Sequence, residues 1–283
     1  MPPLAMYIQY LAFIRLPTEK AHGLQIMKTC EALAIAGAVV ELVIPGRATS
    51  IATDPFTHYA VQKNFTVTAL GTPDWVPTGK LGFLGSLLWF AEAAKWRKGF
   101  WKTDIVYSRD ALVLLQYIFL GRKLVYEAHQ TPTALSRFVA RRAYRVVVIS
   151  KSLMDAYVTA GVVHDKIILA TDAVDEHLFD HCADKTAVRR TLGIAPESKV
   201  VFYGGSLRKE KGPETLADAV PLVPDVVFIF AGGVNPSRAE FWSSVPARFL
   251  GQILHEQLVA CLRAADVLVI PNSAHDLDAA RYG

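Results

Sequence analysis

Short runs of β-forming apolar residues alternate with longer stretches of helical periodicity, and this alternation restricts the fold more than any other feature of the chain. Its first cycle predicts strands at Tyr7–Ile14, Val39–Ile44, Ile105–Tyr107, Leu124–Tyr126, Val146–Ile149 and Ile167–Ala170, with helices over 22–36, 83–98, 110–120 and 133–144. Parallel strands need long crossover connections, which are usually helices. The pattern therefore predicts an α/β fold, a parallel sheet with helices on both faces.

A second cycle of the same kind begins after a polar stretch. It holds predicted strands at 199–203, 226–230 and 267–270 and predicted helices at 213–220 and around 254–264. We therefore expect two Rossmann-like, doubly wound domains, which are residues 1–179, a linker over 180–197, and residues 198–283. A doubly wound domain usually carries five or six strands, so the second domain is predicted to be incomplete.

Length and composition agree with this organisation. The chain has 283 residues, of which 52% are hydrophobic, enough for two cores of ordinary size. Its three cysteines form no CxxC pair, which excludes a disulfide framework and a thiolate zinc site and fits a reducing compartment. We see no secretory signal and no apolar run long enough to span a membrane, so a cytoplasmic location is expected.

Basic residues are concentrated in the first half of the chain. Residues 1–150 carry 17 basic and 9 acidic side chains, whereas the remainder carries 13 and 17. The apolar stretch 81–90 is followed by Lys, Arg, Trp and Phe interleaved over 95–102, a pattern that suits an anionic membrane surface, with peripheral attachment through 81–102. The alternative is an ordinary buried helix with a solvated basic end. No nucleic-acid-binding module is found, so nucleic acid is not an expected partner.

Glycines after predicted strands indicate phosphate binding. In open α/β sheets, ligands lie at the carboxyl ends of the strands, where helix N-termini favour anions. Gly23, with Lys20 before it, is expected in the loop before a helix that begins near Leu24. A second loop, 203–213, holds Gly205, Ser206, Arg208 and Lys211, and a third holds Gly232. A solvated basic turn is the alternative for the second loop, which matches neither GxxxxGK[ST] nor GxGxxG.

His129 follows the predicted strand Leu124–Tyr126 and is expected at the edge of the crevice, in a catalytic or orienting role. The strand pattern predicts that Glu127 points away from His129. The remaining histidines show no ligand spacing, so no metal site is expected.

Taken in order, these segments resemble the retaining glycosyltransferases of family 4, the group 1 glycosyltransferases, which have the GT-B fold of two Rossmann-like domains facing across a cleft. The similar passages are Arg15–Gln25, Ile149–Leu153 with Ile167–Phe179, Gly205–Gly212 and Leu250–Pro271. Asp172-Ala173 stands where the family usually has Asn-Gly, and Ser206 stands where many relatives have Arg.

The resemblance implies a role for each matching residue. It implies that domain 1–179 binds the acceptor and domain 198–283 the nucleotide sugar, with His129 beside the transferred sugar and Lys211 on the diphosphate. Donor contacts are implied for Gly23, Lys20, Gly205, Ser206, Arg208, Gly232, Gln252 and Ile253. The implied activity is sugar transfer with retention of configuration to an envelope glycan or lipid-linked acceptor in polysaccharide biosynthesis, without metal or cofactor. The sequence leaves the nucleotide, the sugar, the acceptor and the oligomeric state open.

The family's acidic donor-binding segment and final helix are missing before Gly283, so we expect a C-terminally truncated relative with weak or absent transfer. Two alternatives are a non-catalytic nucleotide-sugar-binding protein and, with less support, a GT-B sugar-nucleotide epimerase. An epimerase would need acidic and histidine residues clustered in the crevice, and the sequence does not predict such a cluster.

Overall fold

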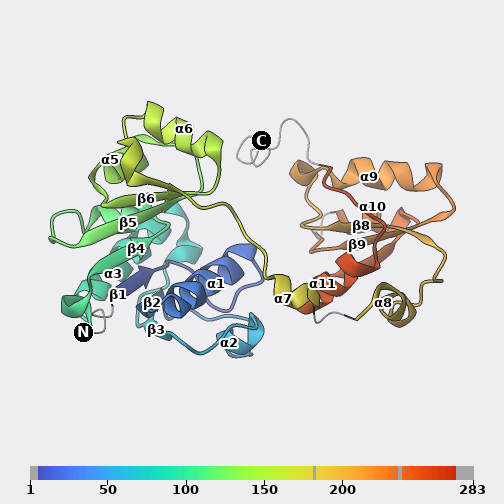
Figure 1. Cartoon of the computed structure of the whole chain (residues 1–283), viewed down its shortest axis with the longest axis horizontal. Coiled ribbons are helices and arrows are strands. Elements are labelled where there is room, and N and C mark those ends of the chain that lie inside the picture. Colours follow the sequence, from blue (N-terminus) through green and yellow to red (C-terminus); the bar gives the residue numbers. More distant parts are fainter. Residues whose placement is uncertain (1–5, 98, 181–182, 235–237, 272–283) are drawn as a thin grey trace. The chain divides into compact units, whose positions relative to one another are not determined.

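The computed structural model describes residues 6–97, 99–180, 183–234 and 238–271, and the chain divides into two compact units, 1–172 and 173–283 (Figure 1). The first unit is built on a seven-stranded parallel sheet in the order β3-β2-β1-β4-β5-β6-β7. Its strands are β1 (Tyr7–Leu11), β2 (Val39–Pro45), β3 (Thr66–Leu70), β4 (Ile105–Ser108), β5 (Lys123–Ala128), β6 (Arg145–Val148) and β7 (Ile167–Leu169).

Helices cover both faces of this sheet. Alternation along β1 sends Tyr10 into the core beneath α1 and Leu11 into the core on the opposite face, because successive strand residues point to opposite sides. Figure 1 shows α5 and α6 over one face and α1 and α2 over the other. The helices of the first unit are α1 (Ala21–Ile35), α2 (Pro55–His58), α3 (Lys80–Lys95), α4 (Ala111–Leu115), α5 (Ala134–Arg142) and α6 (Lys151–Thr159). The predicted doubly wound arrangement is present in this unit.

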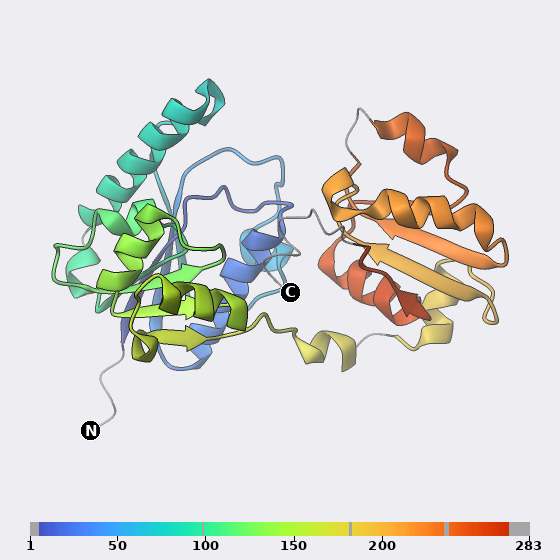
Figure 2. The same cartoon turned by 90° about the horizontal axis from the view of Figure 1, so that it is seen from above.

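The helix α3 carries large apolar residues on its outer side as well as on the side that faces the sheet. Leu87, Phe90 and Ala91 are buried against the sheet, whereas Leu81, Leu88 and Trp89 on its outer side are exposed. In Figure 2, α3 is the teal helix, and one end of it extends beyond the sheet of the first unit.

The second unit holds a four-stranded parallel sheet in the order β10-β9-β8-β11. Its strands are β8 (Lys199–Gly204), β9 (Val226–Ala231), β10 (Arg248–Gly251) and β11 (Val267–Leu268). Its helices are α7 (Glu176–Asp180), α8 (Lys185–Thr191), α9 (Pro213–Ala219), α10 (Ala239–Ser244) and α11 (His255–Ala264). β3 and β10 were not predicted, because neither Thr66–Leu70 nor Arg248–Gly251 is a continuous apolar run.

The predicted linker 180–197 differs most from the structure. It contains α8, which packs against α11 inside the second unit. Arg189 of α8 is buried and donates to the carbonyl of Ala264 (3.0 Å) and to the carboxylate of Asp266 (2.7 Å). Lys185 and the amide of Val200 also donate to Asp266, at 2.6 and 2.8 Å. These charged contacts tie α8 to the start of β11, so the segment is part of the domain.

Replacing Arg189 by Met should therefore destabilise the second unit. The substitution keeps the length of the side chain but leaves the Ala264 carbonyl without its donor, and we expect the free energy of unfolding to fall by about 2 kcal/mol. Urea unfolding followed by circular dichroism measures the change. The matched control is Arg190→Met on the exposed side of the same helix, and an equal effect of both variants would contradict the role given to Arg189.

Candidate functional site

A cavity of about 440 Å³ opens in the first unit, at the carboxyl ends of its central strands. The strand order reverses between β1 and β4, and such switch points are where open α/β sheets bind ligands. The lining comes from the end of β1 and the residues after it (10–14), the segment after β4 (108–112), the segment after β5 (129–136), and His22 and Ile26 of α1. His129, predicted from sequence to lie at the crevice, is among the lining residues.

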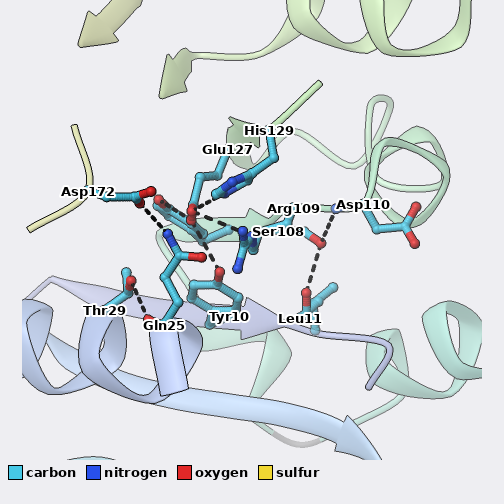
Figure 3. Close-up of polar contacts among 11 residues, drawn as sticks. Tyr10, Leu11, Gln25, Thr29, Ser108, Arg109, Asp110, Glu127, His129 and Asp172 are labelled. Atoms are coloured by element: carbon cyan, nitrogen blue, oxygen red, sulfur yellow. Dashed lines mark hydrogen bonds and ion pairs between the residues drawn. The ribbon is translucent and has the colours of Figure 1, made fainter. Parts of the chain in front are cut away.

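The carboxylate of Glu127 lies beneath this cavity and joins three strands (Figure 3). One carboxylate oxygen, Oε2, accepts hydrogen bonds from the Tyr107 hydroxyl at 2.9 Å and the Tyr10 hydroxyl at 3.2 Å. The other, Oε1, lies 2.6 Å from His129 Nε2 and 3.5 Å from Arg109 Nε. The four partners come from β1, β4, the residue after β4 and the residue after β5, so one buried charge organises the whole edge.

The ionisation of this cluster follows from its contacts. Burial by itself raises the pKa of Glu127, but the hydrogen bond from His129 and the positive charge of Arg109 outweigh burial, and the pKa of that carboxyl is lowered. Burial, followed by the negative charge of Glu127, raises the pKa of the Tyr10 and Tyr107 hydroxyls. The tyrosines therefore remain protonated donors to an ionised carboxylate.

The expectation that Glu127 points away from His129 was wrong. Residues two apart on a strand face the same side, and His129 lies one residue beyond β5, where its ring turns back onto the Glu127 carboxylate. Sequence reasoning also missed Arg109 and Asp110. Their position directly after the β4 strand, at the same sheet edge as His129, was the available clue.

Asp110 closes the far side of the cavity. Its Oδ1 accepts from the amides of Leu112 and Val113, so it caps α4. Burial raises the pKa of Asp110 despite these amide donors. The Ser108 hydroxyl donates to the Leu11 carbonyl at 2.8 Å and accepts from the Asp110 amide at 3.1 Å, which fixes the turn after β4 against β1.

Gly23 lies inside α1, which begins at Ala21, earlier than the predicted start near Leu24. A Cβ at Gly23 would lie 2.3 Å from the hydroxyl of Tyr59. That hydroxyl accepts from the Thr18 amide (2.7 Å) and donates to the Thr18 carbonyl (2.8 Å), so it holds the loop before α1. Close packing thus gives a structural reason for the glycine. Lys20 is exposed and occupies the N-cap position of α1 without a side-chain capping hydrogen bond. The donor roles of both residues stay predictions.

In the second unit, the structure brings the predicted glycine loops together at the carboxyl ends of β8, β9 and β10. The Gly205 amide donates to the Ala231 carbonyl (2.8 Å), and the Gly232 amide donates to the Gly251 carbonyl (2.7 Å). A Cβ at Gly232 would lie 1.7 Å from the Gly205 carbonyl oxygen, so only glycine allows this approach.

The polar residues predicted with these glycines follow the same strand ends. Gln252 comes directly after β10, and its amide nitrogen lies 3.2 Å from a Cβ built on Gly233. Ser206 accepts from Arg208 Nε at 3.2 Å. Lys211 ends a single 3₁₀ turn, 209–211, immediately before α9, and Ile253 follows Gln252. The predicted residues thus form two groups, with Lys20, Gly23 and His129 in the first unit and the rest in the second.

Within residues 6–97, 99–180, 183–234 and 238–271, no three His, Cys, Asp or Glu side chains are placed to share a metal ion. Over the same ranges, no helix is both long and apolar enough to cross a membrane.

The second unit is similar in sequence to known proteins. Residues 184–275 match the family model "Glycosyl transferases group 1". A D-inositol 3-phosphate glycosyltransferase from Mycolicibacterium gilvum is 30% identical over 100 residues, which cover 31% of this chain and 23% of that protein. The matched region thus spans about a quarter of the length of this curated relative.

Solved structures agree on the fold of the whole chain. Sucrose-phosphate synthase from Thermosynechococcus elongatus superposes with a TM-score of 0.71 at 18% identity, covering 94% of this chain and 75% of that one. Anabaena HepE in complex with UDP-glucose gives 0.66 at 18% identity, covering 96% and 75%. UDP-GlcNAc 2-epimerase from Neisseria meningitidis gives 0.68 at 11% identity, covering 93% and 77%. The fold is GT-B, which serves both transferases and epimerases.

The lowered pKa of Glu127 predicts a specific pH dependence of stability. A carboxyl whose folded pKa is depressed stabilises the fold above its unfolded pKa, near 4.3, and this contribution is lost as the pH falls through the folded value. Glu127→Gln should therefore lower the free energy of unfolding by about 1–3 kcal/mol at pH 7, and the difference from the parent should shrink below about pH 4.

Tryptophan fluorescence during urea unfolding can follow this, because four of the five tryptophans lie in the first unit. Asp155→Asn, on the exposed side of α6, is the charge-matched control. A Glu127→Gln deficit that stays constant down to pH 3 would show that the carboxylate charge is not what stabilises the edge.

Proposed function

We propose that this protein transfers a sugar from a nucleotide-sugar donor to a glycan or lipid-linked acceptor with retention of configuration, because residues 184–275 match the group 1 glycosyltransferase family model. The observation that carries the proposal is the convergence of the Gly205, Gly232 and Gln252 segments at one edge of the sheet inside the matched region. Glycine loops at the carboxyl ends of parallel strands are a usual place for phosphate groups in α/β sheets.

Each group has a defined part in the proposed reaction. The bond between the anomeric carbon and the diphosphate oxygen breaks, an acceptor hydroxyl oxygen bonds to the same carbon, and the hydroxyl proton is released. Lys211 would stabilise the charge on the departing diphosphate, so that no metal is needed for that purpose. His129, held by Glu127, would lie beside the transferred sugar.

The GT-B relatives support a nucleotide donor. Anabaena HepE was solved with UDP-glucose, and the starch synthase IV of Arabidopsis thaliana was solved with ADP. The epimerase alternative has the structural likeness to UDP-GlcNAc 2-epimerase in its favour. The family match over 184–275 favours transfer instead.

Binding of a nucleoside diphosphate is the first test. In a thermal-shift panel of UDP, GDP, ADP and NAD, we expect one diphosphate to raise the melting temperature. Lys211→Ala should weaken that binding about tenfold, because a charged hydrogen bond to phosphate is lost. Lys209→Ala, an exposed lysine of the same turn, is the control. Stabilisation by none of the nucleotides would reject the donor site, and UDP-GlcNAc epimerisation without transfer would favour the epimerase.

The exposed residues on the outer side of α3 support the proposal that the protein binds peripherally to an anionic membrane. Large apolar side chains of a helix normally face the core, yet Leu81 is 84% and Trp96 79% exposed. Residues 81–102 contain one acidic residue, Glu92, and its carboxylate lies 2.6 Å from the ammonium of Lys95. Lys80 and Lys102, at the ends of this segment, are exposed, and this combination of aromatic, aliphatic and basic side chains suits a headgroup layer.

Vesicle cosedimentation tests this surface. We expect binding to vesicles containing phosphatidylglycerol and weaker binding to pure phosphatidylcholine, and the double variant Leu81→Ser/Leu88→Ser should lose most of it, because two exposed apolar side chains no longer enter the bilayer. Ile35→Ser/Leu222→Ser removes two exposed apolar side chains elsewhere and should bind as the parent does. Equal losses in the two double variants would assign the effect to general surface hydrophobicity.

A further inference from the structure

The two acidic groups at the cavity of the first unit already accept hydrogen bonds from the protein. Both oxygens of Glu127 are already used, one by two tyrosine hydroxyls and the other by His129 and Arg109. The other acidic lining residue, Asp110, uses its Oδ1 on two amides of α4. Figure 3 shows its carboxylate turned away from the Glu127 cluster. The acidic groups therefore serve the protein's own donors.

Arg109 keeps a donor that the protein does not satisfy. Its side chain is 19% exposed and lines the cavity, and its Nε faces Glu127. Its Nη1 is buried and, among the residues that the structure describes, has no hydrogen-bond acceptor. An unmade bond from a buried charged donor is costly, and a planar guanidinium suits an oxyanion particularly well.

The surroundings of Arg109 add donors and positive potential. His22, on α1 across the cavity, has its pKa lowered first by burial and then by the positive charges of Lys20 and Arg109. Thr131 adds a hydroxyl on the side formed after β5, whereas the Thr133 and Ser136 hydroxyls on that side are engaged in capping α5. A ligand that accepts hydrogen bonds and carries negative charge would complement this lining.

We propose that the cavity binds an oxyanion, the phosphate or carboxylate of an anionic acceptor, with Arg109 as the residue that selects for its charge. This inference rests on the proposed function, since it names the acceptor class of that transferase. It concerns the first unit, whereas the donor diphosphate is assigned to the second unit. A neutral sugar hydroxyl offers Arg109 an acceptor without a negative charge, so neutral sugars are expected to bind more weakly.

Inorganic phosphate is the probe, titrated into the full chain at constant ionic strength with chloride as the replaced anion. We expect saturable changes in the ring NMR signals of His22 and His129, both of which line the cavity. Arg109→Gln should weaken phosphate binding about tenfold. Arg109→Lys should have an intermediate affinity for phosphate, because it keeps the positive charge but loses the paired N–H donors of the planar guanidinium. Arg137→Gln, an exposed arginine of α5, should change nothing. A parallel titration with acetate tests whether the cavity binds a carboxylate.

A second variant guards against misfolding of Arg109→Gln. Thr131 is exposed at the cavity rim, so Thr131→Glu should fold normally and weaken phosphate through repulsion. The proposal is overturned if neither anion gives saturable changes, or if phosphate affinity is the same in the parent and both variants. It is also overturned if Arg109→Gln weakens UDP as much as phosphate, since the anion would then be the donor's. Nucleotide binding that depends on Lys211 with no anion effect leaves the donor site standing and rejects this inference alone.

Discussion

The buried carboxylate of Glu127 is the constraint on which the first unit's functional edge depends. An ionised carboxylate loses its hydration on burial, at a cost of several kcal/mol, unless protein donors replace the water. Here Tyr10, Tyr107, Arg109 and His129 replace it from three strand ends. The bonds to this one charge therefore tie β1, β4 and β5 together where the strand order reverses. Because moving any of these donors would leave the buried charge without a partner, the cluster stabilises the shape of the cavity.

The second unit reaches its site by a different physical route. Its strand ends converge through backbone groups, and the approach of Gly232 to the Gly205 carbonyl leaves no room for a side chain. The Gly205 and Gly232 amides donate to main-chain carbonyls, so this edge is held by packing of the backbone and not by a buried charge. The family match lies within this unit.

Arg189 and Asp266 show the same principle of compensated charge in a structural role. Arg189 is only 5% exposed, and its hydrogen bonds anchor α8 in the second unit, where composition alone predicted a polar linker. The sequence of α8 is polar because most of its surface faces water and its one deep contact is ionic. A prediction based on apolar periodicity cannot detect a helix that is anchored in this way.

The alternation of apolar runs was sufficient to predict the parallel α/β class and most strands, because burial on both faces of a sheet requires apolar residues at regular positions in the chain. The GT-B fold was predicted from the resemblance to a known family, not from the alternation. Edge strands such as β3 were not predicted, since a half-exposed strand needs no continuous apolar run. The sequence also placed His129 at the crevice and gathered the glycines of the second unit. Only the tertiary structure decided that Glu127 faces His129 and that Arg109 lines the cavity with Nη1 lacking an acceptor among the described residues. It also decided that the Tyr59 hydroxyl leaves no room for a side chain at Gly23. These facts depend on side chains from segments far apart in the chain, and their meeting is set by strand order and packing, which no local pattern encodes.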